Sequence, residues 1–162
     1  MRWPLNVTAE KRNSRTGSTA TTSRQSQGGA GGAAVKAAPA APPPPAGALV
    51  RTLTPDPVLL FRYSALTGNG HRIHYDLDYV TREEGYPGLV VHGPLQAVLL
   101  FDAACRHEPG RTPTRFDFRG VRPLFDFETA TVNGRTRDDG ATEVFTATAD
   151  GAVCMQAIMQ WV

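Results

Sequence analysis

Apolar and polar side chains alternate with a period of two in the C-terminal part of the chain, which is the pattern of half-buried β-strands. One alternating stretch covers residues 125–132 and is followed by Asn133-Gly134, a dipeptide typical of tight hairpin turns. A second covers residues 144–149 and lies between Asp139-Gly140 and Asp150-Gly151. Strands joined by such short turns run antiparallel, so we expect an antiparallel sheet here.

The last strand is expected at about residues 152–162, and its two sides differ in character. One side is mixed, whereas the other is mostly apolar and carries Val153, Met155, Ala157, Met159 and Trp161. A sheet with one apolar face covers that face with another element. A further strand is expected at residues 115–121.

The covering element is predicted at residues 93–106, where apolar side chains occupy nearly the whole circumference of a helix. Pro94 suits the first helical turn, because the N–H that proline lacks would have no partner there. A helix that is apolar all round is expected to be buried. Upstream, Val58–Phe61 is expected to start a strand and residues 63–76 to form a polar loop. One buried helix with several antiparallel strands indicates an α+β fold in which a sheet wraps a helix.

Composition divides the chain near residue 50. Residues 1–50 hold six basic groups and one acid, and residues 16–47 consist mainly of Gly, Ala, Pro, Ser, Thr and Gln. Such a segment has too few apolar side chains to offset the conformational entropy lost on ordering. We therefore expect a disordered arm at residues 1–50 and one folded domain at residues 51–162.

The composition of the folded part excludes several classes of protein. Residues 51–162 carry eleven Arg, no Lys and fourteen acids, which suits a nucleic-acid binder poorly. No apolar run reaches the roughly 18 residues of a membrane-spanning helix. From the charge balance and the lack of such a run, we expect neither nucleic acid nor a membrane as a partner. Cys105 and Cys154 cannot form a disulfide scaffold and indicate buried thiols in a reducing compartment. We expect a cytoplasmic protein, with the mitochondrial matrix as second choice because the arm is basic and rich in Ser and Thr.

Three of the four histidines, His71, His74 and His92, lie in or next to the polar stretch that precedes the predicted helix. Four runs of the folded part are distinctive: Leu60–Thr67, Asn69–Asp76, Glu84–Gln96 and Phe118–Leu124. These runs resemble the MaoC-like hydratases and dehydratases of acyl thioesters, in the branch with mesaconyl-CoA hydratase and type 2 hydroxyacyl-thioester dehydratase. The resemblance covers almost all of the folded part and none of residues 1–50. It implies a single hot-dog fold, an antiparallel sheet wrapped around a buried central helix. It also implies reversible addition of water to a 2-enoyl thioester without metal or redox cofactor.

The resemblance also assigns candidate catalytic residues. The family's hydratase loop reads Gly-Asp-x-Asn-Pro-Leu/Ile-His, and its catalytic Asp and His fall on Asn69 and His74. An amide does not exchange protons near neutral pH, so Asn69 is expected to orient a water by hydrogen bonds. Proton transfer then falls on His74, because an imidazole titrates near neutral pH. His71 is a candidate relay between His74 and solvent.

The thioester carbonyl oxygen gains negative charge during hydration, so N–H donors should face it. The start of the predicted helix offers unpaired N–H groups and the positive end of the helix dipole. Pro94 has no N–H, which leaves the Gly93 amide, and this matches the family's oxyanion glycine. Guanidinium groups suit a substrate carboxylate or the phosphates of a carrier. The predicted substrate contacts are Arg62, Arg72, Tyr75 and His92, with Arg119 and Arg122 as further guanidinium candidates. For a dicarboxylic substrate, Arg72 is the nearest of these arginines in sequence.

Several of these residues have simpler alternative interpretations. His71 and His74 have the spacing of metal ligands, but no third ligand is suitably spaced, so no metal site is predicted. Asp76 and Asp78 are expected to cap a short helix or to face water rather than to form a catalytic pair. His92 fits a structural hydrogen bond before the helix as well as it fits a functional role.

Residues 51–162 have room for one hot-dog repeat, whereas the mesaconyl-CoA hydratase type usually carries two. A lone repeat leaves a sheet edge open, so we expect a homodimer or association with a second hot-dog subunit. The expected substrate is an acyl-CoA or acyl-carrier thioester, including a dicarboxylic one such as mesaconyl-CoA. Two alternatives stay open: a truncated, non-catalytic acyl-thioester-binding subunit, and a hot-dog thioesterase.

Overall fold

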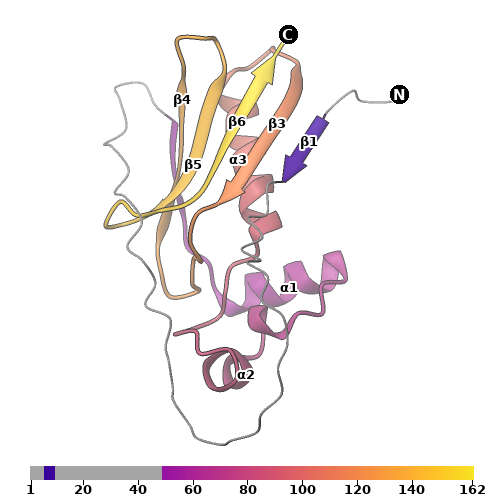
Figure 1. The fold of residues 1–162 in the computed structure, drawn as a ribbon, viewed down its shortest axis with the longest axis vertical. Helices are drawn as coiled ribbons and strands as arrows, with labels where there is room; N and C mark the ends of the chain where they lie inside the picture. Colours follow the sequence, from indigo (N-terminus) through magenta and orange to yellow (C-terminus); the bar gives the residue numbers. More distant parts are fainter. Residues whose placement is uncertain (1–5, 10–48) are drawn as a thin grey trace, which may run out of the picture.

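The computed structural model describes residues 6–9 and 49–162 (Figure 1). Its strands form one sheet in the order β1-β3-β6-β5-β4-β2, and neighbouring strands are antiparallel except for the parallel pair β1 and β3. The strands are β1 (Asn6–Ala9), β2 (Leu49–Leu53), β3 (Pro113–Gly120), β4 (Ala130–Thr136), β5 (Thr142–Thr148) and β6 (Val153–Trp161). The helices are α1 (Pro57–Thr67), the short 3₁₀ turn η1 (Arg72–His74), α2 (Leu77–Arg82) and α3 (Gly93–His107).

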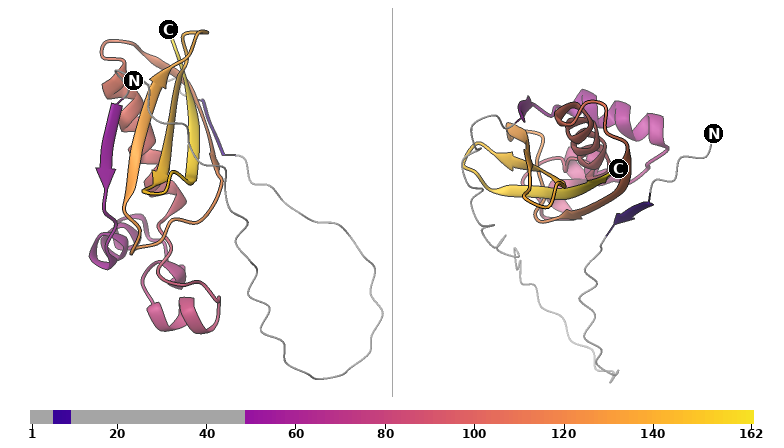
Figure 2. Two further views of the ribbon diagram at one scale, coloured as in Figure 1. Left: turned by 90° about the vertical axis from the view of Figure 1, so that its left-hand side faces the viewer. Right: turned by 90° about the horizontal axis from the view of Figure 1, so that it is seen from above.

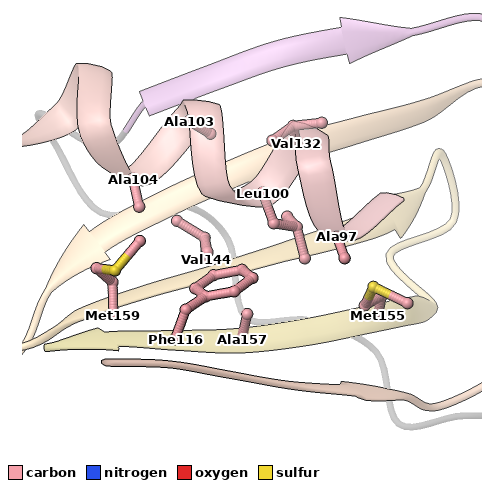
Figure 3. Close-up of a cluster of buried hydrophobic side chains, with 10 residues drawn as sticks. All are labelled: Ala97, Leu100, Ala103, Ala104, Phe116, Val132, Val144, Met155, Ala157 and Met159. Carbon is pink, nitrogen blue, oxygen red and sulfur yellow. The ribbon is translucent and has the colours of Figure 1, made fainter. Parts of the chain in front are cut away.

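Helix α3 lies along one face of the sheet, and the strands curve around it (Figure 2). The predicted α+β hot-dog fold is thereby confirmed. The small side chains of Ala97 and Ala104 let the helix approach closely, and Leu100 is fully buried between them (Figure 3). Burying apolar area of this kind contributes about 25 cal/mol per Å² to folding. The sheet side of this core consists of Phe116, Val132, Val144, Met155, Ala157 and Met159.

A second apolar cluster holds α1 and α2 at the end of the sheet where α3 begins (Figure 1). Leu60 of α1 and Val80 of α2 are both fully buried in it, next to Leu95 in the first turn of α3. The remaining members are Leu89, Val91, Leu124, Ala130 and Cys154. This cluster fixes the segments that carry the candidate site residues against the start of α3.

The expectation that α3 is buried all round is wrong for one side of the helix. Val98 is 58% exposed, because the sheet covers only the side that carries Leu100 and Ala104. Asp102 on the outer side forms ion pairs with Arg106 and with Arg51 of β2. The outer side of α3 is therefore mixed in character, with the exposed Val98 next to the ion-paired Asp102 and Arg106.

The strand expected to start at Val58–Phe61 is instead helix α1, and the loop expected at residues 63–76 is partly helical. Asp56 caps this helix by accepting a hydrogen bond from the Leu59 N–H at 2.7 Å, and Pro57 occupies its first turn. Gly68 ends it in the left-handed conformation at φ 64°. The caps favour a helix here, whereas a run of four apolar residues by itself is compatible with either a helix or a strand.

The turn predicted at Asn133-Gly134 is also wrong, because both residues lie inside β4 and pair with β5. The hairpin turns at Arg137–Gly140, where Gly140 adopts φ 79° and its N–H donates to the Arg137 carbonyl. The strand predicted from residue 125 begins only at Ala130. Before it, Glu128 accepts a hydrogen bond from the Phe125 N–H and closes a local turn.

Two short strands fall within or next to the predicted arm. β1 pairs with β3, which the prediction of a disordered arm at residues 1–50 did not include, and β2 starts at Leu49 rather than after residue 50. The remaining arm residues, 1–5 and 10–48, lie outside the described residues. Among the described residues, no helix is long and apolar enough to cross a membrane.

Candidate active site

The candidate site lies where the end of α1, the turn η1 and the start of α3 meet. After Gly68 ends α1, the Asn69 side chain accepts a hydrogen bond from the His71 N–H at 3.0 Å through Oδ1. An amide whose oxygen accepts in this way keeps both hydrogens of its Nδ2 for another acceptor. Asn69 is half-buried, whereas His71 is exposed.

His74, at the end of η1, is buried and has one defined hydrogen bond. Its Nδ1 lies 2.7 Å from the carbonyl oxygen of Val90, while the Val90 N–H donates to the Ile73 carbonyl at 3.0 Å. A carbonyl oxygen only accepts hydrogen bonds, so Nδ1 of His74 carries the proton. In the neutral ring, Nε2 is therefore the nitrogen with a free lone pair.

His92 brings His74 to the start of α3. The two imidazole rings are stacked with 3.7 Å between their centroids and 18° between their planes, and His92 directly precedes Gly93 in α3. His92 is fully buried, and its Nε2 lies 2.8 Å from the hydroxyl oxygen of Ser64 in α1. The structure thus brings together His74 and the helix start that carries Gly93, as the sequence predicted.

Burial keeps both rings uncharged at neutral pH. Desolvation lowers the pKa of His74 below its usual 6.5, and the nearby His71 lowers it further, although the hydrogen bond to Val90 acts in the opposite direction. Desolvation, together with the nearby His74, lowers the pKa of His92 to about 4. A neutral His74 is the form that can accept a proton.

A concavity of about 220 Å³ opens beside these residues. Its lining is partly apolar, from α1, and partly polar, from the loop that follows. The lining residues are Phe61, Ser64, Ala65, Gly68, Asn69, Gly70 and Tyr75. A larger concavity of about 400 Å³ lies on strands β3, β5 and β6. Neither lining includes a histidine, but the smaller concavity is lined by Asn69, which bonds to the His71 N–H, and by Tyr75, which follows His74. We therefore place the candidate site at the smaller concavity.

The predicted substrate contacts fall into different environments. Tyr75 lines the concavity and donates its hydroxyl hydrogen to the Gly70 carbonyl at 2.8 Å. Arg72 is already held by Asp76, with its Nη2 2.8 Å from the carboxylate, and it lies over the Tyr79 ring. Arg62 is exposed on α1 next to the lining residue Phe61. His92 lies behind the lining and is not among the lining residues.

The remaining polar candidates are engaged elsewhere. Asp76 caps α2 by accepting a hydrogen bond from the Tyr79 N–H, as the cap interpretation predicted. Arg122 forms an ion pair with Glu128, and Arg119 lines the larger concavity on the sheet. Among the described residues, no group of three His, Cys, Asp or Glu side chains could hold a metal ion.

Ser64 is the site residue that the sequence reasoning missed. It lies 28 positions from His92, and the segment that contains it was expected to be a loop rather than a helix. A buried hydroxyl in an otherwise apolar helix face is a weak signal by itself. Only the packing of α1 against the start of α3 identifies its partner.

The sequence of the chain matches one protein family and is similar to two characterised proteins. Residues 6–126 match the family described as hydroxyacyl-thioester dehydratase type 2. The match therefore extends into residues 1–50, which the predicted resemblance left out, and it ends before β4. Over 113 residues the chain is 50% identical to mesaconyl-C(4)-CoA hydratase of Chloroflexus aurantiacus, covering 70% of this chain and 40% of that protein. Over 74 residues it is 40% identical to the mitochondrial hydroxyacyl-thioester dehydratase type 2 of Schizosaccharomyces pombe, covering 44% of this chain and 25% of that protein. The chain therefore spans less than half the length of either relative.

Solved structures share the fold at low sequence identity. The (R)-hydratase of A. caviae matches with a TM-score of 0.61 and 15% identity over 78% of this chain and 96% of that chain. A chain of the ChsH1–ChsH2 complex of Mycobacterium tuberculosis matches with a TM-score of 0.60 and 17% identity over 78% of this chain and 97% of that chain. Hot-dog proteins of this kind thus include members of hetero-oligomeric complexes.

Proposed function

We propose that this chain, which belongs to the family of type 2 hydroxyacyl-thioester dehydratases, adds water to the 2,3 double bond of an enoyl thioester and catalyses the reverse dehydration. The supporting observation is the position of His74. Its Nδ1 is bound to the Val90 carbonyl, its Nε2 has no hydrogen-bond partner in the described part of the chain, and its ring stacks on the residue that precedes Gly93.

In the hydration direction, His74 Nε2 takes a proton from water while the water oxygen bonds to C3 of the enoyl group. The electron pair of the 2,3 double bond moves towards the thioester carbonyl and gives an enolate. The protonated His74 then delivers its proton from Nε2 to C2, and the carbonyl re-forms. His74 ends neutral, as it began, and the product is a 3-hydroxyacyl thioester.

The enolate oxygen needs donors that are in place before the reaction. The Gly93 N–H lies in the first turn of α3, where no preceding turn supplies an intrahelical carbonyl partner, and the positive end of the helix dipole adds to its effect. Preorganised donors of this type lower the barrier for enolate formation because they need no rearrangement. Asn69, with Oδ1 occupied by the His71 N–H, offers its Nδ2 hydrogens to the oxygen of the water or hydroxyl. The exposed His71 then links His74 to solvent as a proton relay.

For a dicarboxylic acyl group such as mesaconyl, we propose Arg62 as the carboxylate partner. Arg72 is held by Asp76, whereas the structure gives Arg62 no ion pair with a described residue, and its neighbours Phe61 and Ala65 line the concavity. A guanidinium at this edge could bind a terminal carboxylate while Phe61 and Tyr75 contact the acyl chain. The carrier is CoA or an acyl-carrier protein.

We further propose that the chain works as a homodimer or with a second hot-dog subunit. Large apolar side chains lie at the surface of the helical layer: Val58 is 65% exposed, Phe61 60% and Val98 58%. Val58 and Phe61 are three positions apart and so share one side of α1, and a contiguous exposed apolar patch is typical of an interface. Mass measurement under native conditions tests this proposal, and a monomer at assay concentration contradicts it.

The activity is tested by following the absorbance of the enoyl-thioester bond with crotonyl-CoA and mesaconyl-CoA. We expect His74→Ala to lower kcat by roughly a thousandfold, the scale of a lost proton-transfer group. His107→Ala is the matched control, because His107 lies at the far end of α3 and bonds to Thr136. Equal rates for His74→Ala and the wild type would refute the role of His74. Release of free thiol without loss of the double bond would indicate a thioesterase instead.

A further inference from the structure

Ser64 and His92 form a buried polar pair directly behind His74. Ser64 is 5% exposed and His92 is fully buried, and the Ser64 hydroxyl oxygen and His92 Nε2 are 2.8 Å apart. The other face of the pair is apolar, because both segments pack into the cluster around Leu60 and Leu95. Buried polar pairs are costly unless they are fully hydrogen-bonded, so this one calls for an explanation.

The hydrogen-bond partners of the two His92 ring nitrogens decide which nitrogen carries the hydrogen. His92 Nδ1 is buried and has no hydrogen-bond partner among the described residues. A buried N–H without an acceptor is costlier than a buried lone pair without a donor, so the hydrogen of the neutral ring belongs on Nε2. Nε2–H then donates to the Ser64 oxygen, and Ser64 holds the plane of the His92 ring in one orientation.

That orientation matters because His74 lies flat against the same ring. With 3.7 Å between centroids and 18° between planes, His74 cannot rotate about its Cβ–Cγ bond without pushing His92 aside. The hydrogen bond to Val90 fixes one edge of the His74 ring, and the stack on His92 fixes its face. Together they leave Nε2 at a single position.

We propose that His92 and Ser64 are positioning residues: Ser64 fixes the His92 ring, and the uncharged His92 ring keeps His74 buried, in one orientation and with Nε2 as its free nitrogen. The proposal rests on the function assigned above to His74 and replaces the predicted role of His92 as a substrate contact. His92 serves this purpose as a neutral group, because a charged ring would repel the His74 imidazolium formed during turnover.

The other titratable groups that face the two rings come from α1 and from the residue directly before η1. The Tyr63 ring meets His92 edge-on at 4.8 Å, and the His71 ring lies 5.9 Å from that of His74. Among the described residues, no Asp, Glu, Lys or Arg side chain is hydrogen-bonded to either His74 or His92. Packing, rather than a nearby fixed charge, therefore controls the state of His74.

The experiment is ¹⁵N NMR of the histidine rings on the full chain, together with kcat and KM as a function of pH. Ser64→Ala is the principal variant, because it removes one oxygen atom and leaves helix α1 intact. We expect its kcat to fall roughly tenfold, the effect of one lost buried hydrogen bond, with KM nearly unchanged. In the spectra, His74 should lose its predominance of the Nδ1–H form, because a ring that can turn no longer keeps Nδ1 on the Val90 carbonyl. Thr67→Ala is the matched control, since Thr67 is an exposed hydroxyl on the same helix that bonds only to the Tyr63 carbonyl.

His92→Gln provides a second, independent test. Glutamine still donates to Ser64 but offers no ring for stacking, so His74 becomes more exposed to water. We expect the protonation midpoint of His74 to rise towards 6.5, and the acid limb of kcat to move to higher pH with it. Unchanged His74 spectra in both variants would overturn the proposal. So would a raised KM with unchanged kcat in Ser64→Ala, because that result makes Ser64 a substrate contact.

The spectra also separate this proposal from the assigned reaction. If the wild-type chain hydrates neither thioester but the His74 signals respond to Ser64→Ala as expected, the reaction is wrong and the positioning role stands. If the chain is active and the signals do not respond, the reaction stands and the positioning role is wrong.

Discussion

The burial of His92 makes the stability of the fold depend on pH in a defined window. In the unfolded chain its pKa is near 6.5, whereas in the folded chain it is about 4. As the pH falls, the unfolded chain therefore binds the proton first. The stabilisation is complete above about pH 6.5 and is lost progressively as the pH falls towards about 4. The lowered pKa of His74 acts in the same direction.

The size of the effect follows from the difference between the two pKa values. At about 1.4 kcal/mol for each tenfold change in a protonation equilibrium, the whole window is worth about 3 kcal/mol, and most of it is lost by about pH 4.5. This is a large part of the roughly 5–15 kcal/mol that holds a typical domain folded. The lowered pKa values of Asp76 and Asp150 act below 3.8, outside this range.

The assay is urea unfolding at about pH 7.5 and about pH 4.5, with wild type, His92→Gln and the control His107→Gln. We expect wild type and control to lose stability on acidification. His92→Gln should lose less stability than the wild type, by roughly 2–3 kcal/mol, because glutamine does not titrate. The same loss in all three proteins would refute the reasoning that burial of His92 opposes its protonation. A gain in wild-type stability at the lower pH would refute it as well.

Three further predictions concern the substrate, the water and the core. Arg62→Gln should lower kcat/KM for mesaconyl-CoA by roughly tenfold or more, since a lost charged hydrogen bond costs about 1.5–3 kcal/mol, and should leave kcat/KM for crotonyl-CoA unchanged. Equal effects on both substrates contradict carboxylate binding by Arg62. Asn69→Asp introduces a carboxylate in place of the amide, which should raise the His74 pKa and move the acid limb of the kcat/KM profile to higher pH. An acid limb at the wild-type pH would contradict the placement of Asn69 beside His74. Leu100→Ala should cost about 3 kcal/mol in urea unfolding, and a cost below about 1 kcal/mol would mean that α3 is not anchored by Leu100.

The success of the sequence interpretation depended on how local each signal was. The helix at residues 93–107 was recognised because Pro94 and a continuous run of apolar side chains lie within it. β6 was recognised because alternation over its length separates Met155 and Met159 from the outer side chains. The failures were also local: Asn133-Gly134 has the composition of a turn, but the cross-strand pairing with β5 overrides it.

The sequence by itself determined the family, the elements with strong periodicity and the residues expected to meet at the start of α3. Only the tertiary structure decided that Arg72 is held by Asp76, that Val98 faces outwards, and that Ser64 is hydrogen-bonded to His92. The physical reason is the range of the interactions. Periodicity and caps depend on neighbours within a few residues, whereas the Ser64–His92–His74 contact depends on how α1 and η1 pack against α3, which no short segment of the chain contains.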